Sequence, residues 1–277
     1  MPAGVVRRLR ALIPGQVVRV VVVEGADLYQ IANVVESRGL CSSARILAAA
    51  KDAPWLAELG LPTPSLEGYL APASYDFFRD TEPHEILKAM VLRRRKDLVA
   101  FAEYAPPPPL RSVHEAVILA SLVEREVRLA AEGPLVARVF LNRLLDLGGE
   151  TRGRLQSDPT AVYGCLAIEP SPDGCQGVTR AAAARRVTPA MLRSQSNPYN
   201  TYRHGGLPPG PIANPGKAAL EAVFRPAAGN QLYFVADGRG GHVFSDSYEE
   251  HRRVVEGSGG GDAQGSGAAH FGQPATP

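Results

Sequence analysis

With 277 residues, of which 45% are hydrophobic, the chain can bury the core of one large domain or of two smaller ones. Its 30 lysines and arginines nearly balance its 28 aspartates and glutamates, so the charge gives no support for nucleic-acid binding. No stretch reaches the roughly 18 apolar residues of a membrane span, and the start MPAGVVRRLRALI lacks the apolar centre of a signal peptide. The sequence as it stands predicts a soluble, folded protein.

The three cysteines, Cys41, Cys165 and Cys175, are too few for a disulfide framework and lack C-x-x-C spacing. The histidines include no H-E-x-x-H motif, so we expect neither a metal site nor a cofactor. Cys165 and Cys175 lie in a loop-like segment. They either form a disulfide in an oxidising compartment or remain two unpaired thiols.

The first predicted elements form a small β-α-α unit. The β-branched run at residues 17–23 predicts a strand. Apolar residues at helical spacing over 28–35, followed by Gly39, predict a helix and its C-terminal cap. A second helix is expected over residues 44–52, with Ser42 as its candidate cap.

Longer helices and a β-hairpin are predicted after a proline-marked boundary at residues 62–64. The helices are expected at residues 83–104, 113–131 and 134–148, and the hairpin at residues 231–246 around a Gly-rich turn. Residues 149–216 are rich in Pro, Gly, Asn and Ser, but their aromatic and apolar members favour an ordered, functional loop region. The low-complexity residues 255–277 are expected to be disordered.

The stretch LASLVEREV places two glutamates, Glu124 and Glu126, within an otherwise apolar run. On a helical wheel of about 100° per residue, Glu126 falls near the centre of an apolar face that includes Leu129. Glu124 lies on the opposite side, where Ser121 keeps the surface polar and Arg128 at i+4 can pair with the carboxylate. Glu124 is therefore interpreted as a solvated surface residue.

A carboxyl group on an apolar helix face must be paired, protonated or open to a ligand. Burial would raise the pKa of Glu126 and hold it as an acid near neutral pH, the state that a general acid needs to protonate a leaving group. The alternative is a buried ion pair with Arg138 or Arg143 from the next helix. Helical periodicity alone leaves both interpretations open.

Seven blocks, in order over residues 18–254, resemble the MltG/YceG-like endolytic murein transglycosylase family: VVEGADLYQIA, LEGYLAPASY, ILASLVERE, ARVFLNRL, LQSDPTAVYG, NPYNTYRHGGLPPGPIANPG and LYFVADGRGGHVFS. Their number and order make the resemblance specific, whereas a lone E-x-E pair would be weak. The essential acid of the family is the second glutamate of its E-x-E motif. That position corresponds to Glu126.

The resemblance implies a lyase that cuts the β-1,4 bond between N-acetylmuramic acid and N-acetylglucosamine within peptidoglycan strands. It adds no water and closes a 1,6-anhydro ring, with Glu126 acting first as acid and then as base, whereas most glycoside hydrolases use two carboxyl groups. Such an enzyme would act in glycan-strand termination and cell-wall assembly. The alternatives are a peptidoglycan hydrolase (muramidase) with Asp158 or Asp173 as the base for water, and a non-catalytic wall-binding protein.

The matching motifs also imply residues that position the substrate. Those with amide, hydroxyl or carboxyl groups suited to a neutral sugar are Gln156, Ser157, Asp158, Asn200 and Tyr202. Glu67 and Tyr75 either line the same cleft or brace their loop. His242, beside the hairpin turn, is either a hydrogen-bonded structural residue or a substrate contact.

The fold implied is α+β: an N-terminal tail (1–17), a partial LysM-like β-α-α module (18–60), a catalytic domain of helices and a β-hairpin (61–254) and a disordered tail (255–277). Members normally begin with a transmembrane anchor, which this sequence does not show, and face the periplasm from the inner membrane. Peptidoglycan strands are the expected partner, with peptidoglycan synthases as further candidates and no nucleic acid. The segment 165–195 is longer than the link expected there.

Overall fold

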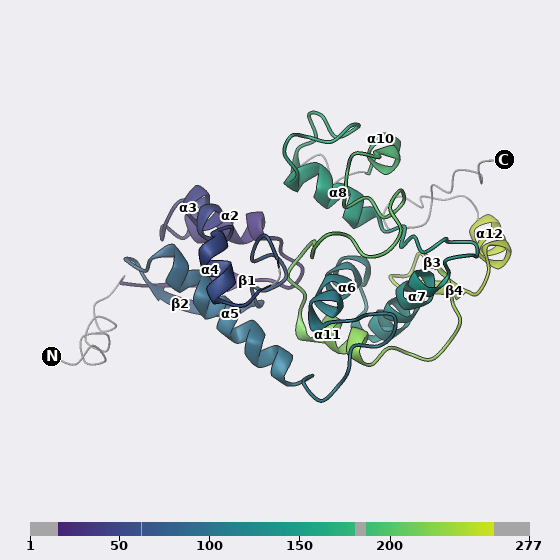
Figure 1. Ribbon diagram of the computed structural model, residues 1–277, viewed down its shortest axis with the longest axis horizontal. Helices are drawn as coiled ribbons and strands as arrows, with labels where there is room; N and C mark the ends of the chain where they lie inside the picture. Colours follow the sequence, from purple (N-terminus) through teal and green to yellow (C-terminus); the bar gives the residue numbers. More distant parts are fainter. Residues whose placement is uncertain (1–15, 62, 181–186, 258–277) are drawn as a thin grey trace. The chain divides into compact units, whose positions relative to one another are not determined.

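The computed structural model describes residues 16–61, 63–180 and 187–257, and the chain divides into two compact units. The first unit contains the residues up to Glu103 together with Ala213–Gly216, and the second contains Tyr104–Ile212 and the residues from Lys217 onward. Both units mix helices with short strands, which confirms the α+β class (Figure 1). Most of both expected tails, residues 1–15 and 258–277, and part of the 165–195 segment lie outside the described residues.

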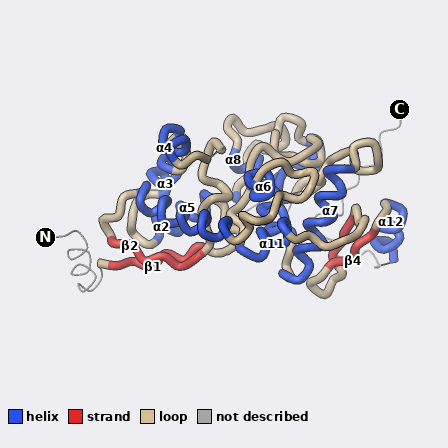
Figure 2. Tube along the Cα trace, turned by 60° about the horizontal axis from the view of Figure 1, so that its bottom comes forward, coloured by secondary structure: helices blue, strands red, loops and turns tan. Residues whose placement is uncertain are grey.

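The first unit is a two-stranded antiparallel sheet whose buried face packs against helices. Its elements are β1 (Val17–Val22), α2 (Leu28–Ser37), α3 (Ser43–Ala49), α4 (Ala53–Glu58), β2 (Ala73–Phe78) and α5 (Pro83–Val99). The two strands run side by side, with Val20 opposite Tyr75 (Figure 2). Alternate residues of β1 are buried, because side chains alternate between the faces of a strand.

The expected strand and helices at the start of the chain are confirmed. Ser42 caps α3 by accepting a hydrogen bond from the backbone N–H of Arg45, and Gly39, just past α2, adopts the left-handed φ of 72°. The first unit nevertheless extends past the module expected at residues 18–60. Because β2 pairs with β1 along its whole length, residues up to Glu103 belong with the N-terminal unit rather than with the second unit.

Asn214 braces the first unit through both atoms of its side-chain amide. Its Oδ1 accepts a hydrogen bond from Leu70 N at 2.8 Å, and its Nδ2 donates to Ala26 O at 3.0 Å and to Glu67 Oε1 at 2.8 Å. The buried Glu67 carboxylate also accepts from the backbone N–H of Leu28, at the start of α2, where a helix favours negative charge. The bracing role that the sequence left open for Glu67 is therefore present.

The second unit is built around three packed helices, with a hairpin and shorter helices beside them. Its elements are α6 (Val113–Glu126), η1 (Ala130–Glu132), α7 (Gly133–Leu145), α8 (Asp158–Ala167), α10 (Pro189–Arg193), α11 (Lys217–Phe224), β3 (Tyr233–Ala236), β4 (His242–Ser245) and α12 (Tyr248–Gly257). Helix α11 packs against both α6 and α7, and β3 pairs antiparallel with β4 as the expected hairpin. No helix in the described part of the chain is both long and apolar enough to cross a membrane.

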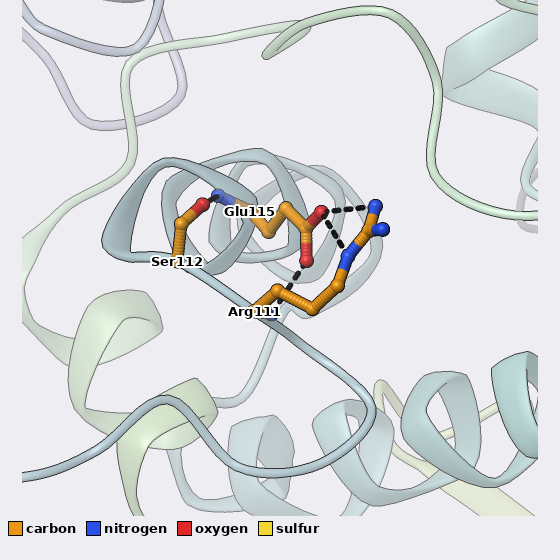
Figure 3. Close-up of polar contacts among 3 residues, drawn as sticks. All are labelled: Arg111, Ser112 and Glu115. Atoms are coloured by element: carbon orange, nitrogen blue, oxygen red, sulfur yellow. Dashed lines mark hydrogen bonds and ion pairs between the residues drawn. The ribbon is translucent and has the colours of Figure 1, made fainter.

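Helix α6 begins at a charged cap (Figure 3). Ser112 Oγ accepts a hydrogen bond from Glu115 N at 3.1 Å, and the Glu115 carboxylate accepts from Arg111 N at 2.6 Å and from Arg111 Nη2 at 2.9 Å. The hydroxyl satisfies one of the N–H groups that a helix start leaves without a partner. Ser112 therefore caps the helix, and the exposed Arg111 adds an ion pair to Glu115 in its first turn.

The other end of α6 differs from the sequence prediction, which placed it near Ala131. The helix stops at Glu126 because the backbone becomes extended at Val127, with φ −85° and ψ 129°. Leu129, expected on the buried face, is 50% exposed. The predicted i+4 pairing of Glu124 with Arg128 assumed a continuing helix, so the spacing rule no longer applies to it.

Ser121 was expected on the surface of α6 and is instead fully buried. Its Oγ donates to Ile118 O at 2.7 Å and accepts from Ile212 N at 3.0 Å. Other helices, α7, α8 and α11 among them, cover α6 on nearly every side, so the helix has no broad polar face in solvent. A small hydroxyl with local backbone partners can be buried at little cost, because its hydrogen bonds are made.

Replacing Asn214 with alanine should lower the free energy of unfolding by about 2–4 kcal/mol. The substitution leaves the buried Leu70 N–H without its acceptor and removes a donor from the buried Glu67 carboxylate. Urea unfolding measures the effect, with Lys217→Ala, an exposed position, as the control. Equal transition midpoints for the two variants would contradict this account of Asn214.

Candidate active site

Glu126, the last residue of α6, has a buried carboxyl group; the residue is 4% exposed. Burial raises the pKa of Glu126 to about 7, because desolvation disfavours the charged form. The hydrogen bond from Ser157 Oγ to Glu126 Oε1, at 2.6 Å, lowers the pKa; the charge of Asp158 raises it, and those of Arg143 and Arg125 lower it. The carboxyl group can therefore give up or take up a proton near neutral pH.

The arginines that the sequence offered as buried partners of Glu126 bind backbone carbonyls. Arg138 Nε donates to a carbonyl at 2.6 Å. Arg143 donates through Nε to Leu232 O at 2.6 Å and through Nη1 to Leu155 O. The charge of Arg143 is one of the smaller contributions to the pKa of Glu126. Within the described residues the carboxyl group is therefore held by Ser157 and not by a buried ion pair.

Ser157 stands at the N-cap position of α8, but its side chain does not cap that helix. Its backbone is held instead. Ser157 N donates to Thr201 Oγ1 at 3.0 Å, Ser157 O accepts from Thr160 Oγ1 at 2.6 Å, and Gln156 N donates to Thr201 O at 3.2 Å. These contacts leave the Ser157 hydroxyl directed at Glu126.

Asp158, the first residue of α8, is oriented by Tyr202. The Tyr202 hydroxyl donates to Asp158 Oδ1 at 2.7 Å, and Tyr202 N donates to Asn200 Oδ1 at 3.1 Å. Burial and the neighbouring Asp158 carboxylate raise the pKa of Tyr202 well above its usual value, so the phenol stays a neutral donor. Asp158 is thus a fixed negative charge beside Glu126.

Gln156 and Asn200 differ in how their side-chain amides are used. Gln156 adopts the left-handed φ of 52°, and its Oε1 is buried without a hydrogen-bond partner in the described part of the chain. Asn200 is fully buried, and its Nδ2 donates to the carbonyls of Met191, Leu192 and Ser194. The Asn200 amide therefore braces its loop, whereas the Gln156 carbonyl oxygen has its acceptor capacity unused.

Glu67 and Tyr75 belong to the first unit, whereas Glu126 belongs to the second. The Tyr75 hydroxyl donates to Ala71 O at 2.6 Å, and burial raises its pKa to about 12. Both side chains thus have partners in their own unit, and the substrate contacts expected for them remain predictions. His242 takes the structural alternative: its Nδ1 lies 2.7 Å from Glu132 Oε2.

Asp173, offered by the sequence as a base for water, is bound by hydroxyl groups. It accepts hydrogen bonds from Ser194 Oγ, at 3.0 Å, and from the hydroxyl and backbone N–H of Ser196. The Ser196 contacts, joined by Ser194, lower its pKa to about 2. Such a carboxylate takes up protons poorly at neutral pH. The nearby Cys165 and Cys175 form the disulfide that the sequence left open.

Three residues that shape this site were not identified as contributors from the sequence. Arg143 was considered only as a partner of Glu126, and Thr160 and Thr201 were not singled out. Thr201 stands between Asn200 and Tyr202 in a matching block, but its partner Ser157 is 44 residues away along the chain. No local pattern could have revealed that contact.

Comparisons with known proteins cover most of the chain. The model of the YceG-like family matches residues 2–257. The endolytic murein transglycosylase of Bacillus subtilis (strain 168) is 30% identical over 270 residues, which cover 91% of this chain and 68% of the relative. That of Streptococcus pneumoniae serotype 2 (strain D39) is 31% identical over 191 residues, 69% of this chain but 32% of the much longer relative.

A solved structure supports the same grouping. The crystal structure of a YceG-like protein from Listeria monocytogenes superimposes with a TM-score of 0.70 at 30% sequence identity, covering 86% of this chain and 76% of the other. The chain therefore belongs to the YceG-like family, and the resemblance inferred from its seven sequence blocks is confirmed.

Glu126→Gln should stabilise the folded protein by roughly 3 kcal/mol at about pH 8 and have little effect at about pH 4. A carboxyl group whose pKa rises from 4.5 to about 7 on folding binds its proton more tightly in the folded state. The destabilisation therefore develops as pH rises between those values and is constant above them. Denaturant unfolding of both proteins across this range measures it; a difference independent of pH would contradict the raised pKa.

Ser157→Ala should raise the pKa of Glu126 by about one unit, because a hydrogen bond to the charged form is lost. An NMR titration of protein labelled with ¹³C at the glutamate carboxyl groups measures this pKa directly. Ser194→Ala, which removes a similar hydroxyl from Asp173, is the matched control. An unchanged Glu126 titration in Ser157→Ala would show that this bond does not set the proton affinity.

Proposed function

We propose that this protein is an endolytic lytic transglycosylase that cleaves the β-1,4 bond between N-acetylmuramic acid and N-acetylglucosamine in peptidoglycan, leaving 1,6-anhydro ends. The main support for this proposal is the state of Glu126. Its carboxyl group is buried, has a pKa of about 7 and is held by the Ser157 hydroxyl. Family membership supports the reaction class, since two curated relatives are named endolytic murein transglycosylases. Glycan-strand termination in wall assembly is the corresponding role.

One carboxyl group serves both proton transfers in this mechanism. Protonated Glu126 gives its proton to the glycosidic oxygen as the bond to the anomeric carbon breaks. The resulting carboxylate then takes the proton of the C6 hydroxyl as that oxygen attacks the same carbon. A pKa near 7 makes both protonation states accessible. Ser157 donates to Oε1, which stabilises the carboxylate between the steps and leaves Oε2 for proton transfer.

The neighbouring polar groups suit a reaction whose transition state carries positive charge on the sugar ring. Asp158, oriented by the Tyr202 hydroxyl, supplies negative charge beside Glu126. Gln156 offers a carbonyl oxygen with unused acceptor capacity for a sugar hydroxyl or an N-acetyl N–H group. We assign the substrate-positioning roles to these residues, with Ser157 as the partner of the acid.

The two alternatives have less support. A hydrolase needs a second carboxylate to activate water, but Asp173 is bound by Ser194 and Ser196 and has a pKa of about 2. Asp158 is already bonded to the Tyr202 hydroxyl. A wall-binding protein gains nothing from a buried carboxyl group with a raised pKa, which costs stability at neutral pH.

We further propose that the antiparallel β1–β2 pair with α2 and α3 is a LysM-like remnant that binds glycan strands. An extracytoplasmic location, on the periplasmic face of the inner membrane and beside peptidoglycan synthases, fits a peptidoglycan substrate. The Cys165–Cys175 disulfide supports an oxidising compartment.

Digestion of purified sacculi with the full chain tests the proposal. Mass spectrometry of the products should show 1,6-anhydro ends without incorporation of oxygen from ¹⁸O-labelled water. Glu126→Gln should reduce cleavage at least about 100-fold, because acid–base catalysis is lost, whereas Glu124→Gln on the same helix should stay within a few-fold of wild type. Reducing ends that carry ¹⁸O would identify a hydrolase, and cleavage unaffected by Glu126→Gln would overturn the assignment.

A further inference from the structure

We infer that Thr201 is a positioning residue of the active site, which holds the Gln156–Ser157 segment so that the Ser157 hydroxyl reaches Glu126 instead of capping α8. The inference rests on the proposed function for its catalytic meaning. Thr201 is buried and belongs to the loop that also carries Asn200. Among the described residues its hydrogen bonds go to Ser157, Thr160 and Gln156 rather than to Glu126, so it acts through Ser157.

The Thr201 side chain and backbone hold two consecutive residues. Thr201 Oγ1 accepts from Ser157 N at 3.0 Å, and Thr201 O accepts from Gln156 N at 3.2 Å. Gln156 has a φ of 52°, in the left-handed region that non-glycine residues seldom adopt. Such a conformation persists only where surrounding contacts fix it. Thr201 supplies two of those contacts.

The proton positions around Thr201 follow from the number of hydroxyl protons available. Thr160 Oγ1 lies 2.6 Å from Ser157 O, a pure acceptor, so its one proton points there. In the 2.8 Å contact between the two threonine hydroxyls, Thr201 must then be the donor. The Thr201 hydroxyl thus accepts from Ser157 and donates to Thr160. Serine could replace it in both tasks, whereas valine, of the same shape, could do neither.

The Ser157 hydroxyl could make either of two hydrogen bonds, one that caps α8 and one to Glu126. A serine at the N-cap position ordinarily accepts a hydrogen bond from the N–H groups of the first helical turn, which stabilises the helix. Here Ser157 makes no such bond and donates to Glu126 at 2.6 Å. Loosening the Gln156–Ser157 segment would let the hydroxyl return to α8. Thr201, together with the Thr160 hydroxyl that it binds, therefore keeps Ser157 on the carboxyl group.

A loss of the Thr201 hydroxyl should be visible at Glu126 because the substitution removes none of the other groups around this carboxyl. These are Asp158 with its partner Tyr202, Arg143 from α7, and Arg125 on α6. Since the Ser157 hydrogen bond lowers the pKa of Glu126, its loss raises that pKa. The protonated form then persists to higher pH, and the alkaline limb of the kcat profile moves upward with it.

The test compares Thr201→Val with Thr201→Ser by NMR titration of Glu126 and by the pH dependence of sacculus cleavage. Thr201→Val should raise the pKa of Glu126 by about half a unit to one unit, in the same direction as Ser157→Ala. Thr201→Ser should restore the wild-type value. Adding Thr201→Val to Ser157→Ala should shift the pKa no further, because the bond it protects is already gone.

Thr151→Val is the matched control: it removes a buried hydroxyl that bonds to Asp146, so it should lower the melting temperature but leave the Glu126 titration unchanged. If Thr201→Val does not fold, Thr201→Ala, which also lacks the hydroxyl that accepts from Ser157 N, should shift the pKa in the same direction. A folded Thr201→Val protein with a wild-type Glu126 pKa, or a further shift in the double variant, overturns the inference. The titration needs no catalysis, so it stays decisive even if cleavage is absent.

Discussion

The burial of one carboxyl group at the end of α6 is the constraint around which the candidate active site is arranged. A carboxylate without water around it is costly, so Glu126 holds its proton until about pH 7. Were it buried with no donor, its pKa would lie higher and the carboxylate would be hard to reach. Ser157 provides the donor, and the two threonine hydroxyls hold Ser157 in place. The pKa of Glu126 is thus set mainly by two opposing effects: desolvation raises it, and the hydrogen bond from Ser157 lowers it.

This balance also explains why the arginines are arranged as they are. A guanidinium bonded directly to Glu126 would fix it as a carboxylate and remove the acid. Arg143 is buried near it but donates to the carbonyls of Leu155 and Leu232, and its cation lies 5.5 Å from the centre of the Tyr233 ring. Arg143 therefore helps to hold the segment before Ser157, and it forms no ion pair that would keep Glu126 deprotonated.

The sequence predicted what is local and missed what is distant. A β-branched run located β1, alternating apolar residues around a Gly-rich turn located the hairpin, and proline start and stop signals located α5. The helical spacing of apolar residues located α2. The same periodicity set Glu126 apart from Glu124. It failed at Ser121 and at the end of α6, where tertiary packing overrides the pattern. The role of Thr201 depends on a partner 44 residues away, which no local pattern records.

The long segment from Cys165 to Gln195 begins in the last turn of helix α8, which carries Asp158, and precedes the loop that carries Thr201. Within the segment, the disulfide binds Cys175 to Cys165 of α8. The residues on either side of the segment are joined at α8, where Asn197 Nδ2 donates to Ala161 O at 2.9 Å. Gly164 makes room for this contact, since an added Cβ would come within 1.9 Å of Asn197 Oδ1. Because α8 and the loop are joined independently of the chain between them, the length of that segment does not decide the geometry at Glu126. The site is set by the two anchored ends, so a long link and an ordered active site are compatible in one chain.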